Sequence, residues 1–162
     1  MQTNMDYINY IRRSCPDGVA VVRGGPKNPG LYGTVEFYQT REGVLVAADV
    51  SGLPGGEGSG GCGWHGFHIH AGSDCGGNET SPFADALGHY NPAGTEHPCH
   101  AGDLPPLLSD DGKAYMLFLT GRFTVREVVG HVVIIHTMPD DFHTQPSGNS
   151  GEMIACGKIM KS

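Results

Sequence analysis

Residues 65–72 read HGFHIHAG, a short run in which histidine alternates with phenylalanine and isoleucine. Such alternation is typical of a β-strand, because successive side chains of a strand point to opposite faces of a sheet. His68 and His70 would then project from one face, where both can reach one metal ion. Histidines on strands are more often solvated or hydrogen-bonded than bound to metal, so this pair alone leaves both interpretations open.

Outward from this run, the same two-residue period predicts an all-β fold. Runs of β-branched and aromatic residues, bounded by Gly, Pro and Asn, follow one another along the chain. We expect eight strands, over residues 19–22, 31–38, 44–50, 65–72, 113–120, 122–125, 130–136 and 153–159. With two long loops, over 72–108 and 138–151, these strands predict an eight-stranded Greek-key β-barrel or sandwich.

The N-terminal residues have a different pattern. Met5, Ile8 and Ile11 recur every third position, which predicts one or two turns of amphipathic helix, with a loosely held arm as the alternative. The whole chain has 162 residues, a length that fits one domain. We therefore divide it into an N-terminal extension, 1–17, and a β-barrel domain, 18–162.

Charge and hydropathy exclude several classes of partner. The formal net charge is −7 and the ten basic residues are scattered, so we expect no nucleic-acid partner and no binding to anionic membranes. No run approaches the roughly 20 apolar residues of a membrane span, and the first residues, MQTNMDYINYIRRS, lack the apolar core of a secretory signal. We expect a cytoplasmic protein, with export after removal of a leader as the alternative.

The 72–108 loop carries a dense cluster of potential metal ligands. Loops of this length without hydrophobic periodicity are uncommon in compact domains unless they are functional or cross-linked. Within it, the segment GHYNPAGTEHPCHAGDL holds His89, His97, His100 and Asp103, and contains no lysine or arginine. Three imidazoles and a carboxylate make a closed tetrahedral set for zinc, which would also order the loop. A histidine-rich surface loop is the alternative.

A further imidazole stands at the end of the apolar run HVVIIH, where His136 closes a predicted strand. A set of four neutral imidazoles without a thiolate favours Cu²⁺, which accepts tetragonal nitrogen coordination.

Six motifs together resemble one family. GFHIH, GHYNP, HAGDL, IIH, DDFHTQPSGNSG and ACG occur in the order found in copper-zinc superoxide dismutases, and the resemblance covers residues 19–159. It implies a copper site formed by His68, His70, His89 and His136. It implies a zinc site formed by His89, His97, His100 and Asp103, so that His89 is shared. It also implies that Asp140 links ligands of both metals, and that Cys75 and Cys156 form a disulfide.

The same resemblance implies an activity. Superoxide would be converted to dioxygen and hydrogen peroxide by alternating reduction and reoxidation of copper, with His89 as a bridging imidazolate that relays a proton. The family usually has an arginine three residues before the last cysteine, where this chain has Met153. We expect an active but slower enzyme, unless a basic residue from elsewhere covers the copper, for which the candidates are Lys158, Arg122 and Arg126.

Two other functions remain open at this point. A copper-binding protein that buffers the metal without turnover would retain the ligands but not the guiding arginine. An immunoglobulin-like adhesive sandwich with incidental histidines would bind no copper. A homodimer is compatible with the resemblance, although the strands show no decisive apolar patch. We expect three histidines to bind no metal: His65, His131 and His143. The resemblance assigns no partner to Cys15, Cys62 and Cys99, and a Cys62–Cys99 bond is a guess.

Overall fold

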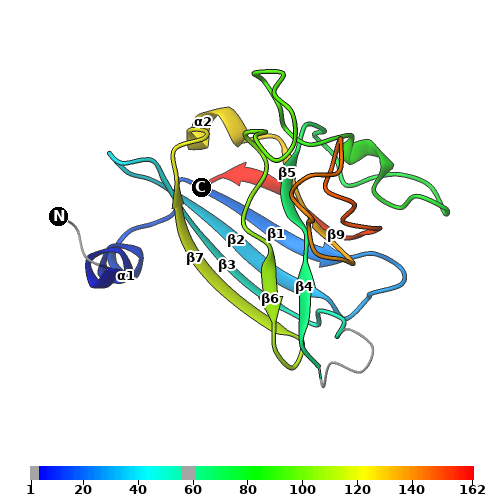
Figure 1. The fold of residues 1–162 in the computed structure, drawn as a ribbon. Coiled ribbons are helices and arrows are strands. Elements are labelled where there is room, and N and C mark those ends of the chain that lie inside the picture. The colour runs from blue at the N-terminus through cyan, green and yellow to red at the C-terminus, as the bar shows by residue number, and fades with distance from the viewer. Residues whose placement is uncertain (1–3, 56–60) are drawn as a thin grey trace.

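Antiparallel strands make up most of the computed structural model, which describes residues 4–55 and 61–162 (Figure 1). Within those residues there are nine strands, two α-helices and one 3₁₀ turn. In chain order the elements are α1 (Asn4–Arg13), β1 (Gly18–Gly24), β2 (Tyr32–Gln39), β3 (Val44–Ser51), β4 (Gly63–His65), β5 (Phe67–His70), η1 (Ala84–Ala86), β6 (Leu107–Ser109), β7 (Lys113–Thr120), α2 (Val125–Val128), β8 (Val132–His136) and β9 (Met153–Lys161).

The strands form one large curled sheet and one small one. Seven strands hydrogen-bond in the order β5-β8-β9-β1-β2-β3-β7, and β4 pairs with β6. Every pairing is antiparallel. Figure 1 shows the large sheet curling, with the β4–β6 pair lying across its open side. The predicted all-β barrel-like class is therefore confirmed.

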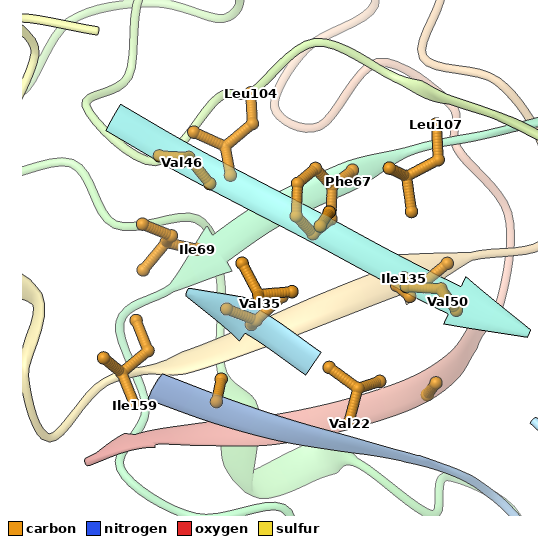
Figure 2. Close-up of a cluster of buried hydrophobic side chains, with 14 of the residues drawn as sticks. Val22, Val35, Val46, Val50, Phe67, Ile69, Leu104, Leu107, Ile135 and Ile159 are labelled. Carbon is orange, nitrogen blue, oxygen red and sulfur yellow. The ribbon is translucent and has the colours of Figure 1, made fainter. Parts of the chain in front are cut away.

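Alternate side chains of the strands fill the interior of this curled sheet. Figure 2 shows Val22, Val35 and Val46 from the large sheet pointing into one apolar cluster, which Leu107 from β6 also enters. All four side chains are at most 1% exposed. Because a strand shows its two faces alternately, every second residue of these strands is committed to this core.

Every residue of strands β5 and β8 is buried, so both faces of these strands are covered. Phe67 and Ile69 point into the core, and Ile135 on the neighbouring strand joins them (Figure 2). The alternate positions of β5, His68 and His70, therefore lie on the outer face of the barrel, yet they are 0% and 3% exposed. The two long loops cover this outer face, which makes it a second, polar interior.

The predicted strand at 122–125 is wrong, because this segment is a turn followed by the helix α2. Thr124 precedes the helix, and its backbone N–H donates to Glu127 Oε2 at 2.7 Å, forming a capping box. The sequence Thr-Val-Arg-Glu carries that signal, which outweighs the β-branched composition of the segment. The strands β4 and β6 were not predicted as separate strands; each has three residues, too few to show a period.

The predicted N-terminal helix is confirmed, and it lies to the left of the sheet in Figure 1, away from the long loops. Ile11 packs against Tyr38, Leu45 and Ala47 on the outer face of the sheet. The boundary between an extension at 1–17 and a domain at 18–162 stays a prediction. No helix among the described residues has the length and apolar character needed to cross a membrane.

A disulfide anchors the first long loop. Cys75 bonds to Cys156 on β9, with Cα atoms 5.7 Å apart, as the resemblance implied. The suggested Cys62–Cys99 bond is wrong, because both cysteines are free and exposed, as is Cys15.

Candidate metal centre

Backbone hydrogen bonds bring the loop histidine His89 next to the strand histidines. The Tyr90 N–H donates to the Ile69 carbonyl at 2.8 Å, and the Ile69 N–H donates to the Gly102 carbonyl at 2.9 Å. The loop thus runs beside β5, with His89 opposite His70. A side chain at Gly102 would overlap the Ile69 carbonyl oxygen, so only glycine allows this close approach.

His136 reaches the same place through an irregularity in β8. The register between β8 and β9 shifts between Ile135 and His136, and a shift of this kind re-aims the side chain that follows it. His136 still pairs with Met153 of β9, and on the other side its N–H donates to the Gly66 carbonyl, just before β5, at 2.9 Å. The ring is 5.5 Å from that of His70, measured between centroids.

The outer hydrogen bonds of these imidazoles fix which nitrogen carries a proton. His70 Nδ1 donates to the Leu87 carbonyl at 2.7 Å, and His136 Nδ1 donates to the Gly151 carbonyl at 3.3 Å. The Nε2 atoms of His70 and His136 then carry lone pairs, and they face each other at 3.4 Å. Two facing lone pairs repel unless a cation lies between them.

Other ring nitrogens at the centre are buried and lack any hydrogen-bond partner. They are His68 Nδ1, His89 Nε2, His97 Nδ1 and His100 Nδ1. A buried polar atom without a partner costs free energy, so in native proteins such atoms nearly always have a partner or an ion. Four orphaned nitrogens within one site therefore indicate that metal ions satisfy them.

The ligand atoms fall into two groups that share His89. Within each group, one atom from each residue lies within 4.8 Å of the others. The first group is His68, His70, His89 and His136, and the second is His89, His97, His100 and Asp103. These are the two sets implied by the resemblance, so the structure brings all seven residues together.

Asp103 supplies the carboxylate of the second group. Its oxygens lie 2.7 Å from His89 Nδ1, 3.1 Å from His97 Nδ1 and 3.3 Å from His100 Nδ1. Burial raises the pKa of Asp103, but the hydrogen bond from His89 and the other imidazoles outweigh burial, and the pKa lies below its usual value. Three nitrogens and one charged oxygen make a donor set that suits zinc.

Three rings of the first group, those of His68, His70 and His136, are kept neutral by their surroundings. Burial, followed by repulsion from the neighbouring imidazoles, lowers the pKa of His70 well below its usual value and that of His136 to about 3. A neutral imidazole has a free lone pair, which is the form that binds metal. An all-nitrogen set of this kind suits copper.

Asp140 joins the two groups from behind. It accepts hydrogen bonds from His68 Nε2 at 2.7 Å and from His97 Nε2 at 2.9 Å. Burial raises the pKa of Asp140, but these bonds and one from the Phe142 N–H outweigh burial and bring the pKa to about 2. Gly148 has φ +69° and lies against Asp140, where a side chain would overlap the carboxylate. The carboxylate therefore orients one ring of each group.

Comparison with known proteins agrees with this geometry. The family model described as copper/zinc superoxide dismutase matches residues 31–159.

The chain belongs to the copper/zinc superoxide dismutase family.

Several relatives support this membership over most of the chain. The chain is 38% identical over 143 residues to a copper-zinc superoxide dismutase of Legionella pneumophila, covering 83% of this chain and 81% of that protein. It is 34% identical to one from Deinococcus radiodurans, covering 78% and 76%. A solved copper/zinc superoxide dismutase from Brucella abortus has a TM-score of 0.72 at 26% identity, and the match covers 86% of this chain and 96% of that one.

The predicted family, enzyme class and cofactors are therefore confirmed: this superoxide dismutase is an oxidoreductase with copper and zinc as cofactors. The relatives do not favour the alternative of a copper buffer, and an adhesive sandwich with incidental histidines does not account for two complete ligand groups. The roles of individual residues rest on the geometry described above.

The three histidines expected to bind no metal lie outside both groups. His65 is buried, with Nδ1 3.0 Å from the His136 carbonyl and Nε2 3.3 Å from the Ser109 hydroxyl. His131 Nδ1 lies 2.9 Å from the Ala71 carbonyl oxygen. His143 is exposed, and its Nδ1 lies 2.9 Å from Asp141 Oδ1.

A pocket of about 610 Å³ opens onto the four-imidazole group, and His70, His89 and His136 form part of its lining. Met153 lines it, as the sequence indicated, but Lys158, Arg122 and Arg126 do not. Lys27 is the only lysine or arginine among its lining residues in the described part of the chain. Sequence patterns gave no signal for Lys27, because it precedes β2 by several residues in a turn.

Lys27 does not act as a free charge. Its Nζ lies 2.9 Å from Glu152 Oε2, and the two side chains are 76% and 67% exposed. Glu79 also lines the pocket. The mouth therefore carries two carboxylates and one ammonium group, which gives it no net positive charge.

Proposed function

We propose that His68, His70, His89 and His136 hold copper, that His89, His97, His100 and Asp103 hold zinc, and that the paired site dismutates superoxide. The observation that carries this proposal is the set of buried ring nitrogens without hydrogen-bond partners, which converge as two groups around the shared ring of His89. When bound, copper supplies a one-electron redox couple at an accessible position and zinc supplies a fixed positive charge.

His89 is the residue that this chemistry depends on most. Its Nδ1 belongs to the zinc group, beside Asp103, and its Nε2 belongs to the copper group. The Nε2 atom can therefore hold a proton in one half of the cycle and give it to the departing peroxide in the other. The side chain is 3% exposed, and it reaches solvent through the pocket that it lines.

The other copper-group residues keep their rings fixed during the cycle. His70 and His136 are tied through Nδ1 to backbone carbonyls, and His68 is tied through Nε2 to Asp140. Such outer hydrogen bonds set ring orientation and basicity. These three rings therefore keep their orientation while His89, shared by both groups, relays the proton.

The approach of superoxide is the step in which this chain differs from the family pattern. A small anion is guided by a local positive potential, and at this mouth Glu152 offsets the charge of Lys27. Met153 supplies no charge and no paired donors. We infer a turnover limited by encounter, slower than in an enzyme with a cationic mouth.

Superoxide decay after pulse radiolysis tests the activity. Protein loaded with one copper and one zinc should accelerate the decay, whereas the metal-free protein and the zinc-only protein should not. Decay no faster with the loaded protein than with the metal-free protein would exclude turnover and leave copper storage as the function.

The compartment and the assembly remain proposals. The sequence predicts a cytoplasmic protein, whereas the Cys75–Cys156 disulfide supports the exported alternative, because disulfides persist mainly in oxidising spaces. For assembly we propose a homodimer, which is compatible with the resemblance, and sedimentation equilibrium of the metal-loaded protein tests it directly.

A further inference from the structure

The segment that carries most of the zinc ligands has little structure of its own. His97, His100 and Asp103 lie within seven residues, in turns rather than in a strand or helix. The residues just before His97, and Cys99 after it, are exposed, whereas the His97 side chain is 0% exposed. Something outside the segment must hold His97 in its buried position.

Gln145, from the second long loop, makes two hydrogen bonds to the backbone of His97. The His97 N–H donates to Gln145 Oε1 at 3.0 Å, and Gln145 Nε2 donates to the His97 carbonyl at 2.7 Å. The side-chain amide thus satisfies both backbone groups of one residue, as a neighbouring strand would. Together with Asp140, which accepts from the ring, Gln145 fixes both the backbone and the ring of His97.

Arg122 holds the same segment from another direction. Its Nη1 donates to the carbonyls of Pro98, His100 and Asp103, at 3.0, 3.2 and 3.1 Å. Arg122 contacts the backbone after His97 but not His97 itself. The segment therefore remains anchored by Arg122 when Gln145 is replaced. For this reason the role of Gln145 can be tested by substitution.

We propose that Gln145 is a positioning residue for the zinc ligand His97, and that its paired hydrogen bonds set the affinity of the site for zinc. It touches no ligand atom and acts only through the His97 backbone. The proposal rests on the assignment of His97 to zinc. Copper binding should depend on Gln145 far less, because His68, His70 and His136 are held by β5 and β8.

The test is zinc affinity of the full chain, measured by competition with a chromogenic chelator, for wild type and Gln145→Met. Methionine has a similar length but can make neither hydrogen bond. We expect the zinc Kd to rise by about 10-fold or more, the effect typical of losing an outer hydrogen-bond partner, with copper Kd changed by less than about threefold. Gln145 is exposed, so its replacement opens no cavity in the core.

Two further variants separate positioning from a general effect on the loop. Thr144→Ala removes the hydrogen bond from Thr144 to Asp141 in the same loop without touching His97, and it should leave zinc Kd unchanged. Gln145→Glu retains the acceptor for the His97 N–H but replaces the amide donor. A carboxylate oxygen then faces the His97 carbonyl, so zinc affinity should fall measurably below that of wild type, by part of the loss in Gln145→Met or by more. The thermal midpoint of the metal-free protein should be the same for Gln145→Met and Thr144→Ala within a few degrees.

The proposal is overturned if Gln145→Met binds zinc as tightly as wild type, if zinc and copper affinities fall together, or if Thr144→Ala has the same effect. If Gln145→Met does not fold, Gln145→Asn, which retains the amide but is one methylene too short, decides by the same criteria. Failure of the proposed function is recognised separately, because wild type itself would then bind no zinc.

Discussion

The two halves of the metal centre are built from different kinds of structure. The copper half takes three of its imidazoles from paired strands, β5 and β8, whose other face is the apolar core. The zinc half takes all of its ligands from the 72–108 loop. Ligand positions in the first half follow from strand register, whereas those in the second depend on side-chain contacts to a loop.

This difference has an energetic consequence. A shift of His68 or His70 would require β5 to slip, which would move Phe67 and Ile69 out of the core. The loop ligands have no comparable penalty, and they are held instead by hydrogen bonds and by the Cys75–Cys156 bond. We therefore expect the copper half to be largely preorganised and the zinc half to be more sensitive to changes outside it.

The largest effect should come from removing one ligand of either half. His70→Ala should lose copper and all measurable turnover while retaining zinc, and His100→Ala should lose zinc while retaining copper. Each affinity loss should exceed the roughly 10–100-fold that follows loss of an outer partner. Metal content after dialysis, measured by mass spectrometry, checks both, and each variant is the control for the other. Equal loss of both metals from either variant would contradict a division into two halves.

The disulfide should give the next largest effect. Cys75→Ala with Cys156→Ala opens a loop whose ends are separated by 81 residues, and the free energy of unfolding should fall by about 4 kcal/mol. Urea unfolding of the metal-free protein measures this change. Zinc affinity should fall more than copper affinity, because the bond anchors the loop that carries the zinc ligands. An unchanged urea midpoint would show that the other contacts suffice.

The difference between the halves also explains what the sequence could predict. His68, His70 and His136 lie in strands, where the two-residue period of the sequence predicts which side chains share a face. The loop ligands were found through their density and through the family motifs, since no periodicity fixes the path of a loop. Gln145 and Lys27 were missed because a polar loop residue has no pattern that reveals its partner. The 122–125 error arose because local β-branched composition competes with a capping box.

Asp140 contacts ligands of both halves, so its replacement should show which half depends more on contacts outside it for metal affinity. Asp140→Asn retains the shape of the side chain, but the neutral amide cannot accept hydrogen bonds from both His68 and His97 as the carboxylate does. Zinc affinity should fall by roughly 10–100-fold. Copper affinity should fall less, because His68 is also held by β5 whereas His97 is held only by loop contacts. Competition titrations of each metal provide the measurement, and a larger loss of copper than of zinc would reverse the proposed ranking.

The smallest effect should appear at the mouth of the pocket that opens onto the copper group, which His100 of the zinc group also lines. Met153→Arg should raise the second-order rate constant several-fold at low ionic strength, because an anion is then attracted to the copper. The gain should shrink at high salt, where the Debye length falls from about 30 Å at 0.01 M to about 3 Å at 1 M. Metal affinities should not change.

A matched pair of variants controls for the position of the charge at the mouth. Glu152→Gln should also raise the rate by releasing Lys27, and Lys27→Gln should lower it. Rates that are the same in all three variants and in wild type, at every salt concentration, would show that charge at the mouth does not limit turnover.

The shared ring of His89 is the feature on which the whole account depends, and removing it is the most direct test. His89→Ala protein should be titrated with copper and zinc, with metal content and the visible copper spectrum recorded against wild type. We predict that zinc affinity falls and that the copper spectrum changes in the same variant, because one ring serves both groups. Wild-type zinc occupancy together with an unaltered copper spectrum would contradict the shared-ligand centre.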